Sequence, residues 1–216
     1  MRQAFDQFLS ALAHARNLGT IAQYISNVSG TAAPDVSDIY RAQVVALISA
    51  FDTLVHNLTR VGMLDALRHV RTHTTHSLNF KVRLTTVLIA IDENTTVAIS
   101  NERNGTNNLP SNNWFANEIR EQHSYSSFQK HDKVAEAIRL FHPNPLWQEV
   151  SLRMGLPEKD VKKRLDLIVT RRNQIAHESD IDPANVGERI AISFTDVASN
   201  IDFIEQLGRH IFDIVR

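Results

Sequence analysis

The residues best suited to acid–base chemistry on a phosphate lie together in RRNQIAH, at 171–177. The Arg172 guanidinium stays charged and grips two phosphate oxygens in a planar fork. The His177 imidazole has an ordinary pKa of about 6.5, so near neutrality it can take up or release a proton. Acid–base chemistry on a phosphate ester needs a base for the attacking hydroxyl, positive charge beside the phosphorus, and an acid for the leaving oxygen. One Arg172 and one His177 cover half of these needs, and two copies supply both the base and the acid.

The spacing of the two residues limits how they can meet. An apolar stripe recurs at three- and four-residue steps along a predicted helix at 158–177, and Arg172 falls inside it: Val161, Leu165, Ile168, Ile175 and Ala176. His177 is turned about 140° from Arg172 on an ideal helix. Either the helix frays near Ala176 and the Arg172 side chain curls round, or two copies face each other across a two-fold axis. In the second case Arg and His from both chains converge on one cleft.

Further residues are candidates for supporting roles. We expect Asn173 to orient His177 or donate to phosphate, and Arg171 to add positive charge. Asp52 and His56 lie four apart, so they share a helix face. This face is either a solvated stripe or lies against the motif, with Asp52 holding Arg172 or His177 in position.

Alternative interpretations of these charged groups stay open. Arg172 could instead form a buried ion pair with Asp166 or Asp52, while His177 only caps the helix end. Lys162, Lys163 and Arg164 form either a solvated face or a contact with a phosphate backbone, in which Lys162 and Lys163 would bind substrate. Arg41, within an apolar stretch, also needs a polar partner.

Three blocks of sequence carry a resemblance to a known family. They read DIYRAQVVALISAFDTLVHNL at 38–58, SSFQKHDKVAEAIRLF at 126–141 and LWQEVSLRMGLPEKDVKKRLDLIVTRRNQIAHESDIDP at 146–183. Together they resemble the RiboL-PSP type of HEPN domain, with RRNQIAH as its Arg-x4-His motif.

The resemblance implies a compact helical domain that dimerises. Many members are metal-independent endoribonucleases in toxin or antiphage roles, and others only bind RNA, a nucleotide or a protein partner. It also implies Arg172 and His177 as catalytic residues, a 2′,3′-cyclic phosphate product, no cofactor and no metal. RNA, a second copy and an antitoxin or operon-encoded protein are the implied partners.

Composition bounds the class of protein. The 216 residues are 43% apolar and 22% charged, and no Pro/Gly/Ser-rich linker divides them, so we expect one domain at 1–216. The absence of Cys excludes disulfides, thiolate nucleophiles and Cys-based zinc sites. A net charge of -1 argues against non-specific coating of nucleic acid.

No segment approaches the roughly 20 apolar residues that cross a bilayer, and the N-terminus is too polar for a signal peptide. We therefore expect a cytoplasmic protein without a membrane partner.

The apolar periodicity predicts an all-α, compact multi-helix bundle that forms a two-fold dimer. Three of the predicted helices are named by their place: the central helix at 38–61, the motif helix at 158–177 and the C-terminal helix at 195–215. The others are at 2–27, 114–122, 133–141 and 146–154. Gly19 is a possible break in the first of these, and Asp132 is the predicted N-cap of the helix at 133–141. Residues 29–35 form a predicted loop. The polar loop at 101–113 is either an idle connection or a flap on the substrate side.

The stretch at 84–100 is ambiguous. Its β-branched residues allow a hairpin around 92–94, and a short buried helix at 84–92 suits the helical surroundings better. Just before it, His73 and His76 have a spacing that could hold a metal, but no third ligand lies nearby. A polar loop or an exposed helix end is the alternative for this pair.

Overall fold

The computed structural model describes residues 1–29, 34–185 and 187–216. Within them the chain is helical, and its one β-type feature is an isolated bridge between Ile181 and Arg189. The prediction of an all-α fold is confirmed. The helices are α1 (Arg2–Ser29), α2 (Ser37–Leu67), α3 (Thr75–Leu78), α4 (Leu84–Asn104), α5 (Asn113–His123), α6 (His131–Arg139), α7 (Leu146–Met154), α8 (Glu158–His177) and α9 (Phe194–Val215). Most of the loop predicted at 29–35 lies outside the described residues.

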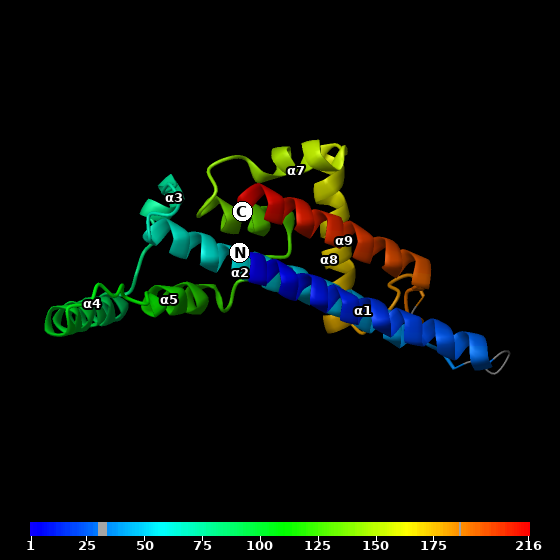
Figure 1. The fold of residues 1–216 in the computed structure, drawn as a ribbon. Coiled ribbons are helices and arrows are strands. Elements are labelled where there is room, and N and C mark those ends of the chain that lie inside the picture. The colour runs from blue at the N-terminus through cyan, green and yellow to red at the C-terminus, as the bar shows by residue number, and fades with distance from the viewer. Residues whose placement is uncertain (30–33, 186) are drawn as a thin grey trace.

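Helix α2 is the core element. It packs against α1, α5, α6, α8 and α9, and α1 and α9 run alongside it in the main bundle (Figure 1). Its side chains at Leu47, Ile48, Phe51 and Leu54 are almost completely buried. Each such side chain stabilises the fold by about 1.5–3 kcal/mol relative to an exposed one. The central position predicted for 38–61 is therefore the observed one.

The apolar character of α2 also bears on the membrane question. Among the described residues, this helix alone is long and apolar enough to cross a bilayer, so our expectation that no segment approaches that limit was wrong. Half of its most apolar stretch is buried inside the protein. Its helical neighbours cover that face, which is the pattern of a core helix.

Gly19, the possible break in the first predicted helix, and Gly62, just beyond the predicted end of the central helix, both lie inside helices. Helix α2 continues past 61 to Leu67, and α1 runs unbroken through Gly19. A side chain at Gly62 would overlap the ring of Phe141, and one at Gly19 would come within 2.7 Å of the Gln43 amide. Both glycines therefore let a neighbouring side chain approach the backbone closely.

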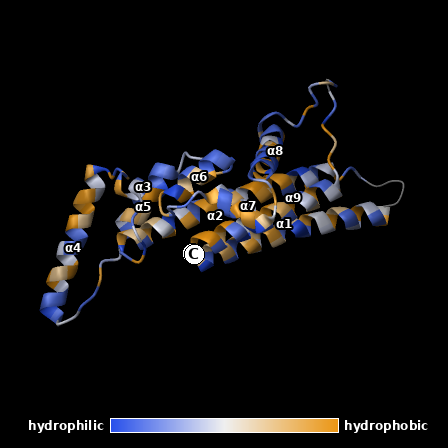
Figure 2. Cartoon of the chain, turned by 90° about the horizontal axis from the view of Figure 1, so that it is seen from above, coloured by the Kyte–Doolittle hydropathy of each residue, from blue (hydrophilic) through white to orange (hydrophobic). Residues whose placement is uncertain are grey.

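The region around α4 differs most from prediction. The stretch forms a helix at Leu84–Asn104, neither a hairpin nor a short buried helix, and only Thr86 and Ala90 are buried in it. Figure 2 shows α4 projecting from one end of the bundle, away from α8. The Glu118 carboxylate in α5 fixes its start, because it accepts hydrogen bonds from Arg83 Nη2 at 2.7 Å and Thr86 Oγ1 at 2.5 Å.

The polar stretch at 101–113 is shorter as a loop than predicted. Residues 101–104 complete α4, Gly105 ends it with a φ of 63°, and Asn113 begins α5. The Asn101 side chain accepts hydrogen bonds from Thr106 Oγ1 at 2.8 Å and Asn108 N at 2.9 Å. The loop is thus folded back on α4, away from the motif helix, and is not a flap over it.

The remaining helices follow the sequence signals more closely. Helices α7 and α8 have the predicted bounds, and Gly155 ends α7 with a φ of 63°. Helix α6 begins at His131, so its N-cap is Lys130 and not Asp132. Helix α9 begins one residue early, with the Ser193 hydroxyl accepting a hydrogen bond from Asp196 N at 3.2 Å.

Candidate functional site

The motif helix α8 stays regular to its last residue. It ends at His177, with Glu178 as C-cap. The helix therefore does not fray near Ala176, and that way of bringing the two motif residues together is excluded. Arg172 is half-buried and His177 is exposed, and a rotation of about 140° places them on different faces of the helix.

Arg172 lies in a groove of about 570 Å³ between the 125–130 segment, the start of α6 and one face of α8. We call it the Arg172 groove. Its lining residues are Tyr125, Ser126, Ser127, Phe128, Gln129, Lys130, Lys133, Glu136, Val169, Arg172 and Asn173. His177 does not line it, so one protomer presents the guanidinium without the imidazole.

The Arg172 guanidinium has no acidic partner among the described residues. Its Nη1 donates to the Asn173 side-chain oxygen at 3.0 Å, while its Nε is shielded from solvent and has no hydrogen-bond partner there. The expected alternative pairing with Asp166 or Asp52 is wrong. Because a guanidinium cannot lose its proton to escape burial, this arrangement favours an anion in the groove.

Asp52 and His56 act on the groove wall and not on the motif residues. The Asp52 carboxylate accepts hydrogen bonds from Phe128 N at 2.7 Å and Gln129 Nε2 at 3.2 Å. His56 Nε2 lies 3.2 Å from the carbonyl oxygen of Ser126. The alternative in which Asp52 holds Arg172 or His177 is therefore wrong. Asp52 and His56 instead hold the 126–129 segment, which faces Arg172.

Asp166 is engaged elsewhere as well. Its carboxylate accepts from His131 N at 3.2 Å and lies 2.6 Å from His131 Nδ1. Trp147 Nε1 donates to the carbonyl oxygen of His131 at 2.8 Å. These contacts join the starts of α6 and α7 to the middle of α8.

The lysines of α8 border a different cavity. Lys162 and Lys163 line a space of about 670 Å³ together with His131 and Asp166. Lys162 forms an ion pair with Glu158. Arg164 turns the other way, donating to Ser199 Oγ at 2.7 Å. The two lysines are therefore placed beside the Arg172 groove and not within it.

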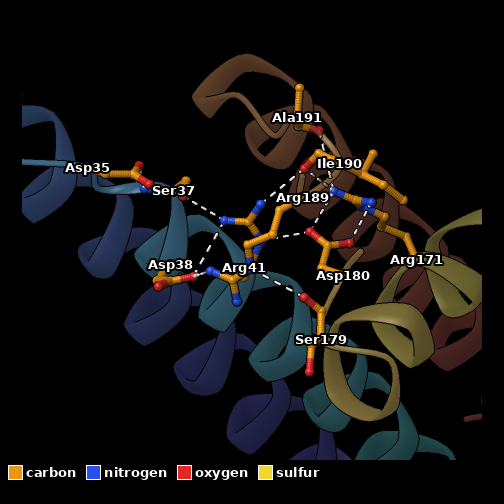
Figure 3. Close-up of polar contacts among 10 residues, drawn as sticks. All are labelled: Asp35, Ser37, Asp38, Arg41, Arg171, Ser179, Asp180, Arg189, Ile190 and Ala191. Carbon is orange, nitrogen blue, oxygen red and sulfur yellow. Dashed lines mark hydrogen bonds and ion pairs between the residues drawn. The ribbon is translucent and has the colours of Figure 1, made fainter. Parts of the chain in front are cut away.

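Arg171 points about 100° away from Arg172 on α8 and belongs to a buried cluster (Figure 3). Its Nη1 lies 2.6 Å from Asp180 Oδ1, and Arg41 Nε donates to Asp180 Oδ2 at 2.6 Å. Both guanidinium groups also donate to the carbonyl oxygen of Ile190 at 3.0 Å. Burial lowers the pKa of Arg171, and Asp180 partly offsets this. Arg171 therefore fixes the chain after His177, a structural role and not the expected contribution of charge to the site.

Sequence reasoning missed two features: the 125–130 segment, which lines the groove, and Asp180, which anchors the chain after α8. Asp180 has a φ of 59° and a completely buried side chain. The signal for it was Arg41, a charged residue in an apolar helix that had to find an acidic partner. The pair is separated by 139 positions, so no local pattern connects the two.

The histidines at 69–76 lie outside this site. His76 is in the short helix α3, and the rings of His69 and His73 meet edge to face at 5.5 Å. In the part of the chain that the structure describes, no three His, Cys, Asp or Glu side chains are grouped to hold a metal ion. The His73 and His76 pair accordingly has no third ligand there.

The RiboL-PSP-HEPN family model matches residues 14–216. The chain belongs to the RiboL-PSP-HEPN family. The match includes both Arg172 and His177 as well as every helix that lines the Arg172 groove. Comparison with curated proteins and with solved structures gave no match. Membership in RiboL-PSP-HEPN indicates a ribonuclease-like or nucleotide-related function for the chain.

Proposed function

We propose that this protein is a metal-independent endoribonuclease that acts as a homodimer in the cytoplasm. The observation that supports it most directly is the Arg172 guanidinium, which faces a groove of about 570 Å³ with Asn173 as its only hydrogen-bond partner among the described residues. A phosphodiester supplies the anionic oxygens that such a group lacks. The proposed biological role is that of a toxin or antiphage effector, controlled by an antitoxin or another operon-encoded protein.

Two protomers are needed because of the geometry of α8. Arg172 opens into the groove, whereas His177 lies on the outer surface, about 7.5 Å further along the helix axis and turned by about 140°. A two-fold axis near the ends of two α8 helices would bring the exposed imidazole of one chain to the guanidinium of the other.

The chemistry then divides among the paired residues. One His177 takes the proton from the 2′-hydroxyl, which attacks the adjacent phosphorus, and the other His177 gives a proton to the departing 5′-oxygen. Arg172 stabilises the negative charge that develops on the phosphoryl oxygens. The products are a 2′,3′-cyclic phosphate and a 5′-hydroxyl end. Asn173 accepts the 3.0 Å hydrogen bond of Arg172 and so orients that guanidinium rather than His177, and its side-chain nitrogen donates to the phosphate as expected.

A non-catalytic HEPN module is the alternative. The observation that favours it is the position of His177, which is exposed and outside the Arg172 groove in one protomer. In that case the groove would bind RNA, a nucleotide or a protein partner through Arg172 without turnover.

An RNA cleavage assay in EDTA separates these functions. We expect the wild-type protein to cut mixed RNA, and Arg172→Ala and His177→Ala each to lower the rate by about a hundredfold or more. The exposed residues His14 and Arg153, on α1 and α7, provide matched control variants, His14→Ala and Arg153→Ala, which should retain activity. Cleavage that survives in both motif variants would exclude this site, and RNA binding without cleavage by the wild type would favour the binding module.

A further inference from the structure

Tyr125 is an aromatic side chain that none of the described residues covers. Its relative exposure is 101%, yet it lines the Arg172 groove. An exposed tyrosine gives up the stabilisation that its large ring would gain by burial. It lies at the rim of a groove whose guanidinium has no acidic partner among the described residues, which indicates a ligand for the ring.

The turn that carries Tyr125 is anchored on both sides. Ser126 N donates to the carbonyl oxygen of His123 at 2.9 Å, and the carbonyl oxygen of Ser126 lies 3.2 Å from His56 Nε2. Two residues later, Phe128 N donates to Asp52 at 2.7 Å, and the Phe128 ring packs on His56 with centroids 4.5 Å apart. The backbone beside Tyr125 is therefore held before any ligand arrives, which lowers the entropic cost of binding.

We propose that the Arg172 groove binds one unstacked nucleotide, with a phosphate on Arg172 and the base on the face of Tyr125. The choice of RNA rests on the proposed function, while the stacking position rests on Tyr125 itself. A volume of about 570 Å³ falls within the roughly 300–1,000 Å³ of small-ligand sites. Lys130 adds positive charge to the lining.

This arrangement makes the protein selective for single-stranded RNA. In a duplex both faces of each base are covered by its neighbours, so a base can reach an aromatic side chain only from a loop, bulge or free strand. An aromatic platform accepts all four bases, because each has a π face. The groove therefore distinguishes single strands from duplexes and not one base from another.

Binding of short RNAs tests the proposal without interference from cleavage. The RNA is a labelled eight-nucleotide strand with 2′-O-methyl riboses, which lack the attacking hydroxyl, offered alone or annealed to its complement. We expect the wild-type protein to bind the single strand more tightly, and Tyr125→Ala to weaken that binding by about tenfold or more. Tyr125→Trp should preserve it. Tyr24→Ala removes another exposed tyrosine, at 68% exposure on α1, and should change nothing.

The outcomes separate this inference from the proposed function. Equal binding by Tyr125→Ala and Tyr24→Ala would overturn the stacking position even if the wild-type protein cleaves RNA. A loss confined to Tyr125→Ala in a protein that never cleaves would support the stacking position and overturn the nuclease. Duplex binding as tight as single-strand binding, or no binding of either RNA, would overturn the proposed selectivity.

Discussion

Arg171 and Arg172 are neighbours in the sequence with opposite environments. The Arg171 guanidinium is paired with Asp180, whereas Asn173, a neutral side chain, is the only hydrogen-bond partner of Arg172 among the described residues. Successive residues on a helix point about 100° apart, which places the two guanidinium groups on different surfaces. The sequence identified Arg172 through the apolar stripe around it. It could not reveal the fate of Arg171, because Asp180 approaches only when the chain after α8 folds back on α2.

Asp180 is expected to contribute strongly to stability, since its side chain is completely buried and that of Arg41 is 6% exposed. Replacing Asp180 with Ala leaves two guanidinium groups without their shared acid, and we expect the free energy of unfolding to fall by about 3 kcal/mol. Urea denaturation measures this change. Glu178→Ala, which removes an exposed acid from the same segment, should change stability by less than about 0.5 kcal/mol. Equal effects of the two variants would contradict the role of the cluster.

His123 gives the protein a pH dependence on the acid side. Burial, reinforced by the nearby His56, lowers the pKa of His123 below its ordinary value of 6.5. The unfolded chain then binds a proton more readily than the native protein, so stability falls as pH falls from about 6.5 through the native pKa. We expect His123→Gln to reduce the loss of thermal stability between pH 7 and pH 5. Burial also lowers the pKa of His210, which acts in the same direction. The thermal stability of the double variant His123→Gln/His210→Gln should therefore depend even less on pH over this range. An unchanged slope in the double variant would refute this.

At the scale of elements, helix boundaries were predictable where a local signal ends the helix. Gly155 adopts the left-handed conformation that ends α7, and Pro157 with Glu158 opens α8 where expected. Helix α4 was not predictable in the same way. Its run of Leu, Ile and Val indicates burial, but α5 covers only the side of α4 that carries Thr86 and Ala90, so Leu88 and Ile91 are 58% and 57% exposed. Which neighbour covers a helix depends on tertiary packing that periodicity does not encode.

Gly62 tests how tightly α2 packs against Phe141, two residues beyond the end of α6. In an exposed helix, replacing Gly with Ala stabilises by about 1 kcal/mol. A Cβ atom at Gly62 would overlap the ring of Phe141, so we expect Gly62→Ala to destabilise the protein by about 1–3 kcal/mol instead. Thermal unfolding gives the sign. The double variant Gly62→Ala/Phe141→Leu should lose less than the two single changes added together, because the smaller side chain makes room for the new methyl group. Additive losses would show that the two sites do not share this contact.

For the whole molecule, the family and the all-helical fold were predictable from three blocks of sequence. The sequence did not predict whether one chain brings Arg172 and His177 together in one site. The blocks place α2, α6 and α8 around Arg172, but the sequence does not show that His177 ends on the outer surface of its own chain. The described groove of one protomer contains a phosphate-binding group and a wall fixed by Asp52, without the His177 imidazole. The proposed nuclease is therefore a property of the dimer.

An inactive protomer should consequently inhibit a normal one. The His177→Ala chain is co-produced in about tenfold excess with a differently tagged wild-type chain. Nearly all wild-type chains then belong to mixed dimers that contain one imidazole. We therefore expect the cleavage rate per wild-type chain to fall by about tenfold. The RNA is kept in large excess over total protein, so that inactive dimers do not sequester it, and recovery through both tags measures the mixed dimer. An undiminished rate in preparations that contain the mixed dimer would mean that each chain works alone. Arg172 and His177 would then have to meet within one protomer, which a regular α8 does not allow.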